Sequence, residues 1–399
     1  MNTEVLYYKN TWIINQLLAK KHWQFDQPTL NFMCAHQTGW FTSIASGYDR
    51  TVDQNHYPVR LDCSSYPQNA SHASLDQIFL DRAKDLWSSN KSLTFLWSGG
   101  IDSTSALIAL ILTNPTWYRD IKVVTTAHSL SQENPAFYKN FLEPYKCLSV
   151  VDGITLLSSE FWLEQEQIVT GDCADQLFGF GFVKRLPGNW LTDETIRDVP
   201  LDQIRSKAFD LVQQQYQWLN QNNKSSHCLN LFHSLPEARD IFMQWFDAFL
   251  SRSPVTLRDG FDFQWWVAFT MKIQMLRHRA AWMMGRTELA NRTRYRAFFD
   301  CGTFERWAID HHEEKWPGRL AATYKKPFRD FIYAYTQDEE YHTSKIKTQS
   351  WRPSLPESVK PKSIIKYLDS SGLILSDQPD AFQNSQMKLS DQQLQSIML

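Results

Sequence analysis

The sequence lacks the features that mark membrane-spanning and disulfide-stapled proteins. No apolar run reaches about 18 residues, so we expect no membrane span. The start, MNTEVLYYKNTW, has no basic segment followed by an apolar one, and we therefore expect no signal peptide. The six cysteines form no CxxC pair, which favours reduced thiols over a disulfide framework or a zinc site. Together these absences predict a cytoplasmic protein.

An excess of charge of either sign is also missing. The chain has 41 basic and 43 acidic residues. Proteins that hold nucleic acid across a whole face are strongly basic, so this balance argues against a nucleic-acid partner. The segment 345–362, KIKTQSWRPSLPESVKPK, is the exception, because its basic residues are able to contact a polyanion. Aromatic residues make up 14% of the chain, which we interpret as a large core.

The chain divides by pattern into three parts. Residues 1–90 mix short apolar–polar alternations with polar turns, which predicts a small α+β segment containing a helix near residues 74–89. Residues 91–335 begin with alternating strands and helices, the pattern of a parallel sheet, and become helical from about residue 202. Residues 336–399 are polar and proline-bearing and predict an extended or partly disordered arm. In the middle part we expect strands at 92–97, 121–127 and 147–151, helices at 103–112 and 135–142, and a further segment, 164–169, that leads into a polar motif.

The run SGGIDSTS, from Ser98 to Ser105, predicts a phosphate-binding loop. It follows the apolar segment LTFLW and opens the next helix. Glycines let the backbone approach an oxyanion, and the N–H groups of a helix start face its negative charge. A plain strand–turn–helix connection would not need two adjacent glycines with this many polar neighbours. We assign the nucleotide to Ser98, Gly99, Gly100, Asp102, Ser103 and Thr104.

Asp102 gives this loop a second function. An aspartate would repel a phosphate unless it holds Mg²⁺, which inverts the local charge. The loop is not of the GxxxxGK[ST] type, because no lysine follows its second glycine. The sequence therefore predicts a loop that binds a phosphate group together with a metal ion.

The loop resembles the SGGxDS loop of the N-type ATP pyrophosphatases, which grips the pyrophosphate of ATP during cleavage between the α- and β-phosphates. A second stretch, TGDCADQLFGF at 170–180, looks like the SGEGADELFGGY motif of the asparagine synthetase and β-lactam synthetase group. By this resemblance Asp175 falls on the family's second Mg²⁺-binding aspartate, and Asp172 on the position that faces the incoming nucleophile. Cys173 and Gln176 depart from the motif, replacing a glycine and a glutamate.

Two further stretches are similar to the same family. YKKPFRDF, at 324–331, matches its KxxLRE segment and puts Lys325 in the place of the catalytic lysine that reaches the α-phosphate. Lys326 is the alternative, one position away, and Arg329 is expected to pair with a helix C-terminus or a carboxylate.

RHRAAWMMG (277–285) and RYRAFFDCGTFERWAI (294–309) match two family helices, with His278 where the family has aspartate. We expect Phe298, Phe299, Phe304 and Trp307 in the core, and Arg279 and Asp300 are candidates for the substrate pocket.

The resemblance covers residues 92–335 and implies an α/β fold. Its sheet would be of the adenine-nucleotide α-hydrolase (HUP-like) type, with a helical C-terminal extension and the small α+β segment before it. Asn2 and the short N-terminal segment imply that the glutaminase domain of asparagine synthetases is lacking. The nitrogen would then come from an amine substrate, free ammonia or a separate protein.

The function implied is an ATP-dependent, AMP- and pyrophosphate-forming synthetase that joins a carboxylate substrate to an amine or ammonia. Lys325 would stabilise the transition state, and Asp172 would orient or deprotonate the amine. The alternatives are an adenylating enzyme that modifies a nucleobase or nucleic acid, and a catalytically inactive nucleotide-binding relative.

Overall fold

The computed structural model describes residues 73–89, 91–151, 161, 164–178, 196–221, 233, 235–273, 294–316, 325–345, 367–368 and 374–376. These residues belong to two compact units. The sheet unit holds the described residues between 73 and 178 and between 294 and 345. The helical unit holds those between 196 and 273 and the two short strands that follow residue 366.

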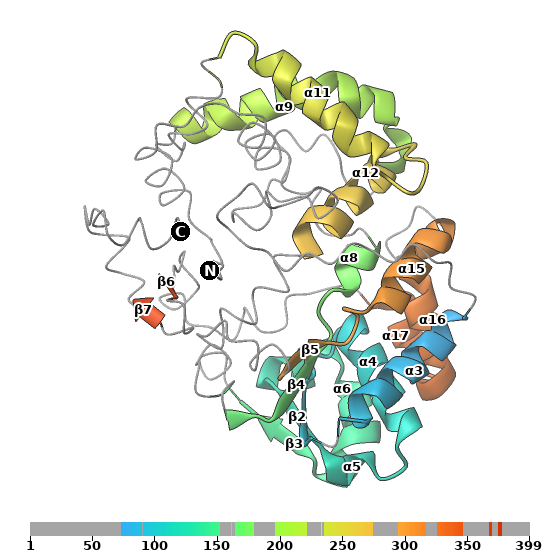
Figure 1. Ribbon diagram of the computed structural model, residues 1–399. Coiled ribbons are helices and arrows are strands. Elements are labelled where there is room, and N and C mark those ends of the chain that lie inside the picture. The colour runs from blue at the N-terminus through green and yellow to red at the C-terminus, as the bar shows by residue number, and fades with distance from the viewer. Residues whose placement is uncertain are drawn as a thin grey trace. The chain divides into compact units, whose positions relative to one another are not determined.

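A five-stranded, all-parallel sheet forms the centre of the sheet unit, with the order β3-β2-β1-β4-β5 (Figure 1). The central strand reads LTFL without polar alternation, because a strand covered on both faces buries successive side chains. The sheet confirms the expected α/β class. Its strands are β1 (Leu93–Leu96), β2 (Ile121–Thr125), β3 (Leu148–Val150), β4 (Gln167–Thr170) and β5 (Tyr295–Ala297).

The side of the sheet on which successive strands are added changes once along the chain. After β1 the chain adds β2 and β3 on one side, and then β4 and β5 on the other. The connections that leave β1 and β4 therefore lead to opposite sides of the sheet, so the carboxyl ends of these two neighbouring strands form a topological switch point. In open parallel sheets this switch point is where ligands bind. Both motifs singled out in the sequence, 98–105 and 170–178, begin at this point.

Helix α4 (Ile101–Thr113) continues directly from the loop after β1. It is apolar almost all round, and every residue from Ser103 to Ile111 is buried, because α3 (Leu75–Trp87) and α16 (Lys326–Thr336) pack against it. Helix α3 starts at the N-cap Ser74, whose side chain accepts a hydrogen bond from the Gln77 amide at 3.3 Å. The remaining helical segments of this unit are α5 (Trp117–Asp120), η2 (Ser129–Glu133), α6 (Pro135–Phe137), η3 (Tyr138–Leu142), η4 (Glu143–Tyr145), α8 (Ala174–Phe178), α15 (Gly302–Asp310), η10 (His312–Lys315) and α17 (Glu339–Ser344).

An aromatic cluster joins these helices beneath the sheet edge. Phe79 of α3 stacks on Phe331 of α16 with ring centroids 4.5 Å apart, and Phe178 of α8 meets Phe328 of α16 at the same distance. Such pairs contribute about 0.5–1.5 kcal/mol each beyond the burial of their area. The cluster thus fixes α8 and α16, which carry two predicted site residues, against each other. The aromatic residues expected in the core, Phe298, Phe299, Phe304 and Trp307, are all buried.

The structure differs from the sequence-based elements in three places. The segment 294–309 was assigned to helix, but its residues Tyr295–Ala297 form the edge strand β5, and α15 begins only at Gly302. The expected helix at 135–142 is a single α turn followed by a π-turn. Residues 339–344, placed in the polar arm, form helix α17. The division at residues 90 and 335 stays a prediction, although α3 and α17 lie in the same compact unit as the sheet.

The helical unit is built from amphipathic helices with aromatic faces. Phe242, Phe246 and Phe249 of α11 are buried, and Trp266 of α12 donates a hydrogen bond from its indole nitrogen to the Phe249 carbonyl at 2.9 Å. Strands β6 and β7 pair antiparallel. The elements of the helical unit are η8 (Ile196–Asp198), α9 (Leu201–Gln221), α11 (Ala238–Ser251), α12 (Gly260–Val267), η9 (Ala268–Lys272), β6 (Tyr367–Leu368) and β7 (Ile374–Ser376).

Within the described part of the chain, none of the helices has both the length and the apolar character that a membrane crossing requires.

Candidate active site

Two glycines allow the loops after β1 and β4 to approach their neighbours. Gly99 has a φ of 74°, and a Cβ there would lie 2.6 Å from the Glu133 Cβ. Gly171 crosses the start of α4 so closely that a Cβ would lie 2.8 Å from the Ser103 nitrogen. Both positions exclude any larger residue. The sequence analysis included Gly99 in the site but not Gly171.

The hydroxyl groups of the loop bond to one another. The Ser98 and Ser103 hydroxyl oxygens are 2.9 Å apart, and Ser103 Oγ accepts from the Ser98 amide at 3.1 Å and donates to the Gly100 carbonyl at 3.3 Å. Gly100 is the N-cap of α4 and provides no side chain to the first turn. The N-terminus of α4 therefore offers its backbone N–H groups and positive dipole end to an anion.

Thr104 lies behind the loop. Its side chain is fully buried, and its Oγ1 accepts a hydrogen bond from the Trp97 indole at 3.1 Å. Tyr341 of α17 reaches the same place and donates its hydroxyl to the Gly99 carbonyl at 3.0 Å. Burial raises the pKa of Tyr341, so the phenol keeps the proton that it donates. These contacts hold the loop in shape from beneath.

Three predicted site residues meet at one point. The Lys325 ammonium donates to Asp102 Oδ1 and to Asp175 Oδ1, the latter at 2.7 Å. The lysine side chain is 1% exposed, whereas the two carboxylates are about one-fifth exposed, at 19% and 21%. The carboxylates thus keep an open side while the lysine is enclosed. Lys325 itself has a left-handed backbone (φ 55°) as the N-cap of α16.

The neighbouring basic residues have other partners. Lys326 is half-exposed and pairs with Asp330 across one turn of α16. Arg329 is buried and donates to the carbonyls of His342 at 2.8 Å and Lys345 at 2.6 Å, at the end of α17. This confirms the expected pairing of Arg329 with a helix C-terminus. Of the two adjacent lysines, Lys325 is the one that faces the acidic loops.

Asp172 lies in a separate cluster of hydroxyl groups. Its Oδ2 accepts from the Tyr295 hydroxyl at 2.8 Å and from Thr170 Oγ1 at 3.1 Å, and these two oxygens are themselves 3.1 Å apart. Tyr295 comes from β5, which pairs with β4 through Thr170 and Ala297. The next residue, Cys173, is buried with a φ of 75°, a conformation that favours glycine. Cys173 therefore occupies a backbone position where a glycine would be unstrained.

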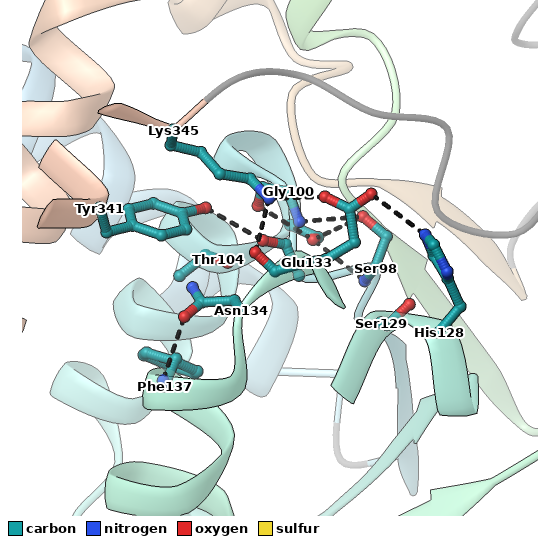
Figure 2. A network of polar contacts seen from close by, with 12 residues as sticks. Ser98, Gly100, Thr104, His128, Ser129, Glu133, Asn134, Phe137, Tyr341 and Lys345 are labelled. Atoms are coloured by element: carbon teal, nitrogen blue, oxygen red, sulfur yellow. Dashed lines mark hydrogen bonds and ion pairs between the residues drawn. The ribbon is translucent and has the colours of Figure 1, made fainter. Parts of the chain in front are cut away.

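A third group of polar residues surrounds Glu133 beside the loop (Figure 2). Glu133 Oε2 accepts from the Lys345 ammonium at 2.6 Å, and His128 Nε2 lies 3.7 Å from Oε1. Glu133 is buried and the Lys345 side chain is only 9% exposed, although the sequence alone placed Lys345 in the polar arm. Neither residue belongs to the matched motifs, so the sequence carried no signal that separated them from solvated charges.

The described residues include no group of three or more His, Cys, Asp or Glu side chains arranged around a metal position. A metal ion at the predicted place would have Asp102 and Asp175 as its protein ligands. Asp300 lies between β5 and α15, where its amide donates to the Ala297 carbonyl at 3.1 Å. His278 and Arg279 lie outside the described residues, as does the basic segment after Lys345.

The chain matches no protein-family model and no curated protein sequence.

Proposed function

We propose that this protein is an ATP-dependent synthetase that joins a carboxylate to an amine or ammonia, with release of AMP and pyrophosphate. One observation carries the proposal. Asp102, Asp175 and Lys325 come from three separate segments and meet at the open edge of a glycine loop and helix N-terminus. The position at the sheet's switch point, and the strand order around it, support assigning the sheet to the adenine-nucleotide α-hydrolase type.

The loop suits a leaving pyrophosphate. Ser98, Gly99, Gly100 and Ser103 would cradle the β- and γ-phosphates with hydroxyl and backbone N–H donors. A carboxylate oxygen of the substrate would attack the α-phosphorus, and the bond between that phosphorus and the oxygen bridging to the β-phosphate would break. The hydrogen bonds within the loop fix the positions of the two hydroxyl oxygens, and each hydroxyl would turn its single proton from its present acceptor to the phosphate.

The two aspartates fit Mg²⁺. They are hard oxygen donors on two different loops, they converge on one cation, and each remains partly exposed. When bound, Mg²⁺ would neutralise phosphate charge at this edge. Lys325 already bridges the same carboxylates with its ammonium group. It would hold the two carboxylates together and add positive charge beside the α-phosphate, where charge develops in the transition state.

Asp172 would serve the second step. There the amine nitrogen attacks the acyl carbon, AMP leaves, and a proton of the nitrogen must be taken up. Asp172 is a partly exposed carboxylate, and one of its oxygens accepts hydrogen bonds from two hydroxyl groups, those of Tyr295 and Thr170. These donors would orient the carboxylate toward the amine.

Product analysis tests the proposal. The purified protein is incubated with α-labelled ATP, Mg²⁺ and pools of carboxylates and amines, and nucleotide products are separated. AMP and pyrophosphate are expected with the right pair, whereas ADP and orthophosphate as main products would contradict the proposal. Asp102→Asn is expected to abolish this turnover with an unchanged circular dichroism spectrum. Turnover like that of the unmodified protein would remove Asp102 from the metal site, and no turnover with any pair would favour an inactive nucleotide-binding relative.

A further inference from the structure

We propose that Glu133 is a positioning residue that holds the Lys345 ammonium at the phosphate loop, so that Lys345 is presented to a bound pyrophosphate group. This inference rests on the proposed function, and it assigns a role to two residues outside the matched motifs. It also gives a reason for the Glu133 carboxylate to lie beside a loop that would bind an anionic phosphate.

Glu133 holds the lysine by two contacts. The Lys345 ammonium donates to the Glu133 main-chain oxygen at 2.5 Å and to its Oε2 at 2.6 Å. An ammonium group has three N–H donors, so one more is directed elsewhere when two bond to a single residue. The side chains are 9% and 1% exposed, which means that the pair is fixed in a nearly dry environment. In such an environment an ion pair is more rigid than on a surface.

The pair lies directly against the loop. Glu133 Cβ is the atom that a side chain at Gly99 would strike, at 2.6 Å, and the Ser129 carbonyl is the next nearest, at 3.2 Å. Residues 129–133 form a π-turn, in which the Asn134 amide donates to the Ser129 carbonyl at 3.2 Å. Single π-turns of this kind are frequent at functional sites. Figure 2 shows the Glu133 carboxylate between Lys345 and His128, next to Ser98.

The charge of Glu133 would by itself oppose anion binding. Its Oε1 is buried and has no hydrogen-bond partner among the described residues, and His128 is beyond hydrogen-bond distance at 3.7 Å. A buried, incompletely bonded carboxylate costs stability and repels phosphate. Two effects of removing its charge therefore have opposite signs. Loss of repulsion would tighten pyrophosphate binding, and loss of the Lys345 position would weaken it.

The direction in which the affinity for pyrophosphate changes when Glu133 loses its charge tests the proposal. Binding of inorganic pyrophosphate with Mg²⁺ is measured by calorimetry for the unmodified protein, Glu133→Gln, Lys345→Met and the double variant. We expect Lys345→Met to weaken binding by about 10- to 100-fold, the effect of one charged hydrogen bond. Glu133→Gln is expected to weaken it by about tenfold in the unmodified protein, and not to weaken it when Lys345 is already Met. His128→Gln, which removes only the distant neighbour of Oε1, is the matched control and should have little effect.

Each outcome decides a separate point. Tighter binding in Glu133→Gln, or equal weakening in both backgrounds, would overturn the positioning role. Thermal denaturation of each variant shows whether it folds, and Glu133→Asp, which keeps the charge, provides a milder variant that should retain part of the affinity. If the unmodified protein does not bind pyrophosphate at all, the proposed function fails, whereas the other outcomes leave that function standing.

Discussion

At the scale of single residues, Lys325 and Lys326 differ sharply in their surroundings. Its buried ammonium separates two carboxylates that would otherwise repel each other. Lys326, its neighbour in sequence, is exposed and pairs only along its own helix. The two lysines therefore form a matched pair for substitution.

We expect Lys325→Met to lower pyrophosphate release by about 10²–10³-fold, the usual effect of losing one preorganised charge. Because the two aspartates then lack their cation, added Mg²⁺ should raise the melting temperature of this variant more than that of the unmodified protein. Lys326→Met should change neither quantity appreciably. Release rates and melting curves at several Mg²⁺ concentrations check both statements. A large loss in Lys326→Met instead would mean that the catalytic lysine is assigned one residue too early.

Gly171 sets the distance between the two loops. In Gly171→Ala the new Cβ would be 2.8–3.0 Å from backbone atoms of Ser103 and Asp102, which cannot rotate away. We expect a loss of about 1–3 kcal/mol in the free energy of unfolding, as for other overpacked sites, and weaker binding of pyrophosphate with Mg²⁺. Gly100→Ala is the control for stability, since its Cβ would meet nothing closer than Ser98 Oγ at 3.5 Å. Urea unfolding compares the two, and equal stability would show that the loops can separate freely.

At the scale of elements, helices α16 and α17 together position side chains at the site. Helix α16 begins with Lys325, and its Arg329 binds the last carbonyls of α17, the helix that leads to Lys345. Tyr341 of α17 bonds the loop at Gly99. The segment 325–345 thus brings two lysines and one tyrosine to the nucleotide site, and its own hydrogen bonds keep α17 in place.

Arg329→Met should release α17. It leaves partly buried carbonyls without their charged donor, so we expect the free energy of unfolding to fall by about 1.5–3 kcal/mol. Amide hydrogen exchange of residues 339–345 should accelerate more than that of α4. Arg329→Lys should recover only part of the loss, because a lysine cannot reach two carbonyls with a planar fork. Unchanged exchange in α17 would show that Tyr341 and Lys345 hold the helix without Arg329.

At the scale of the whole chain, the arm after residue 335 has two different parts. Residues 336–345 dock on the sheet unit, with Tyr341 buried, whereas the short pair β6–β7 belongs to the helical unit. A two-stranded pair contributes little stability by itself. We expect deletion of the residues after Leu355 to leave the melting temperature nearly unchanged, and deletion of the residues after Gln337 to lower it markedly. Differential scanning calorimetry of both truncations tests this, and a large drop in the first would show that the final segment packs on the body.

Local sequence determined the elements near the nucleotide loop. An apolar run followed by two glycines and polar residues predicts strand, loop and helix, and β1 and α4 agree with it because neighbouring residues alone dictate that pattern. The pairing of Arg329 with a helix C-terminus and the burial of the aromatic residues near Phe298 were predicted in the same way. Strand β5 was not, because three residues at a sheet edge carry too short a pattern to distinguish from helix.

Tertiary structure decided which charges meet. Asp102, Asp175 and Lys325 were named from the sequence, but their convergence depends on the order of the strands and on the aromatic cluster that joins α8 to α16. Tyr295, Glu133 and Lys345 were missed because a side chain's polarity or charge does not reveal which distant groups it contacts. Each becomes part of the site only when a distant segment arrives against it, and contacts between distant segments are not encoded in any local pattern.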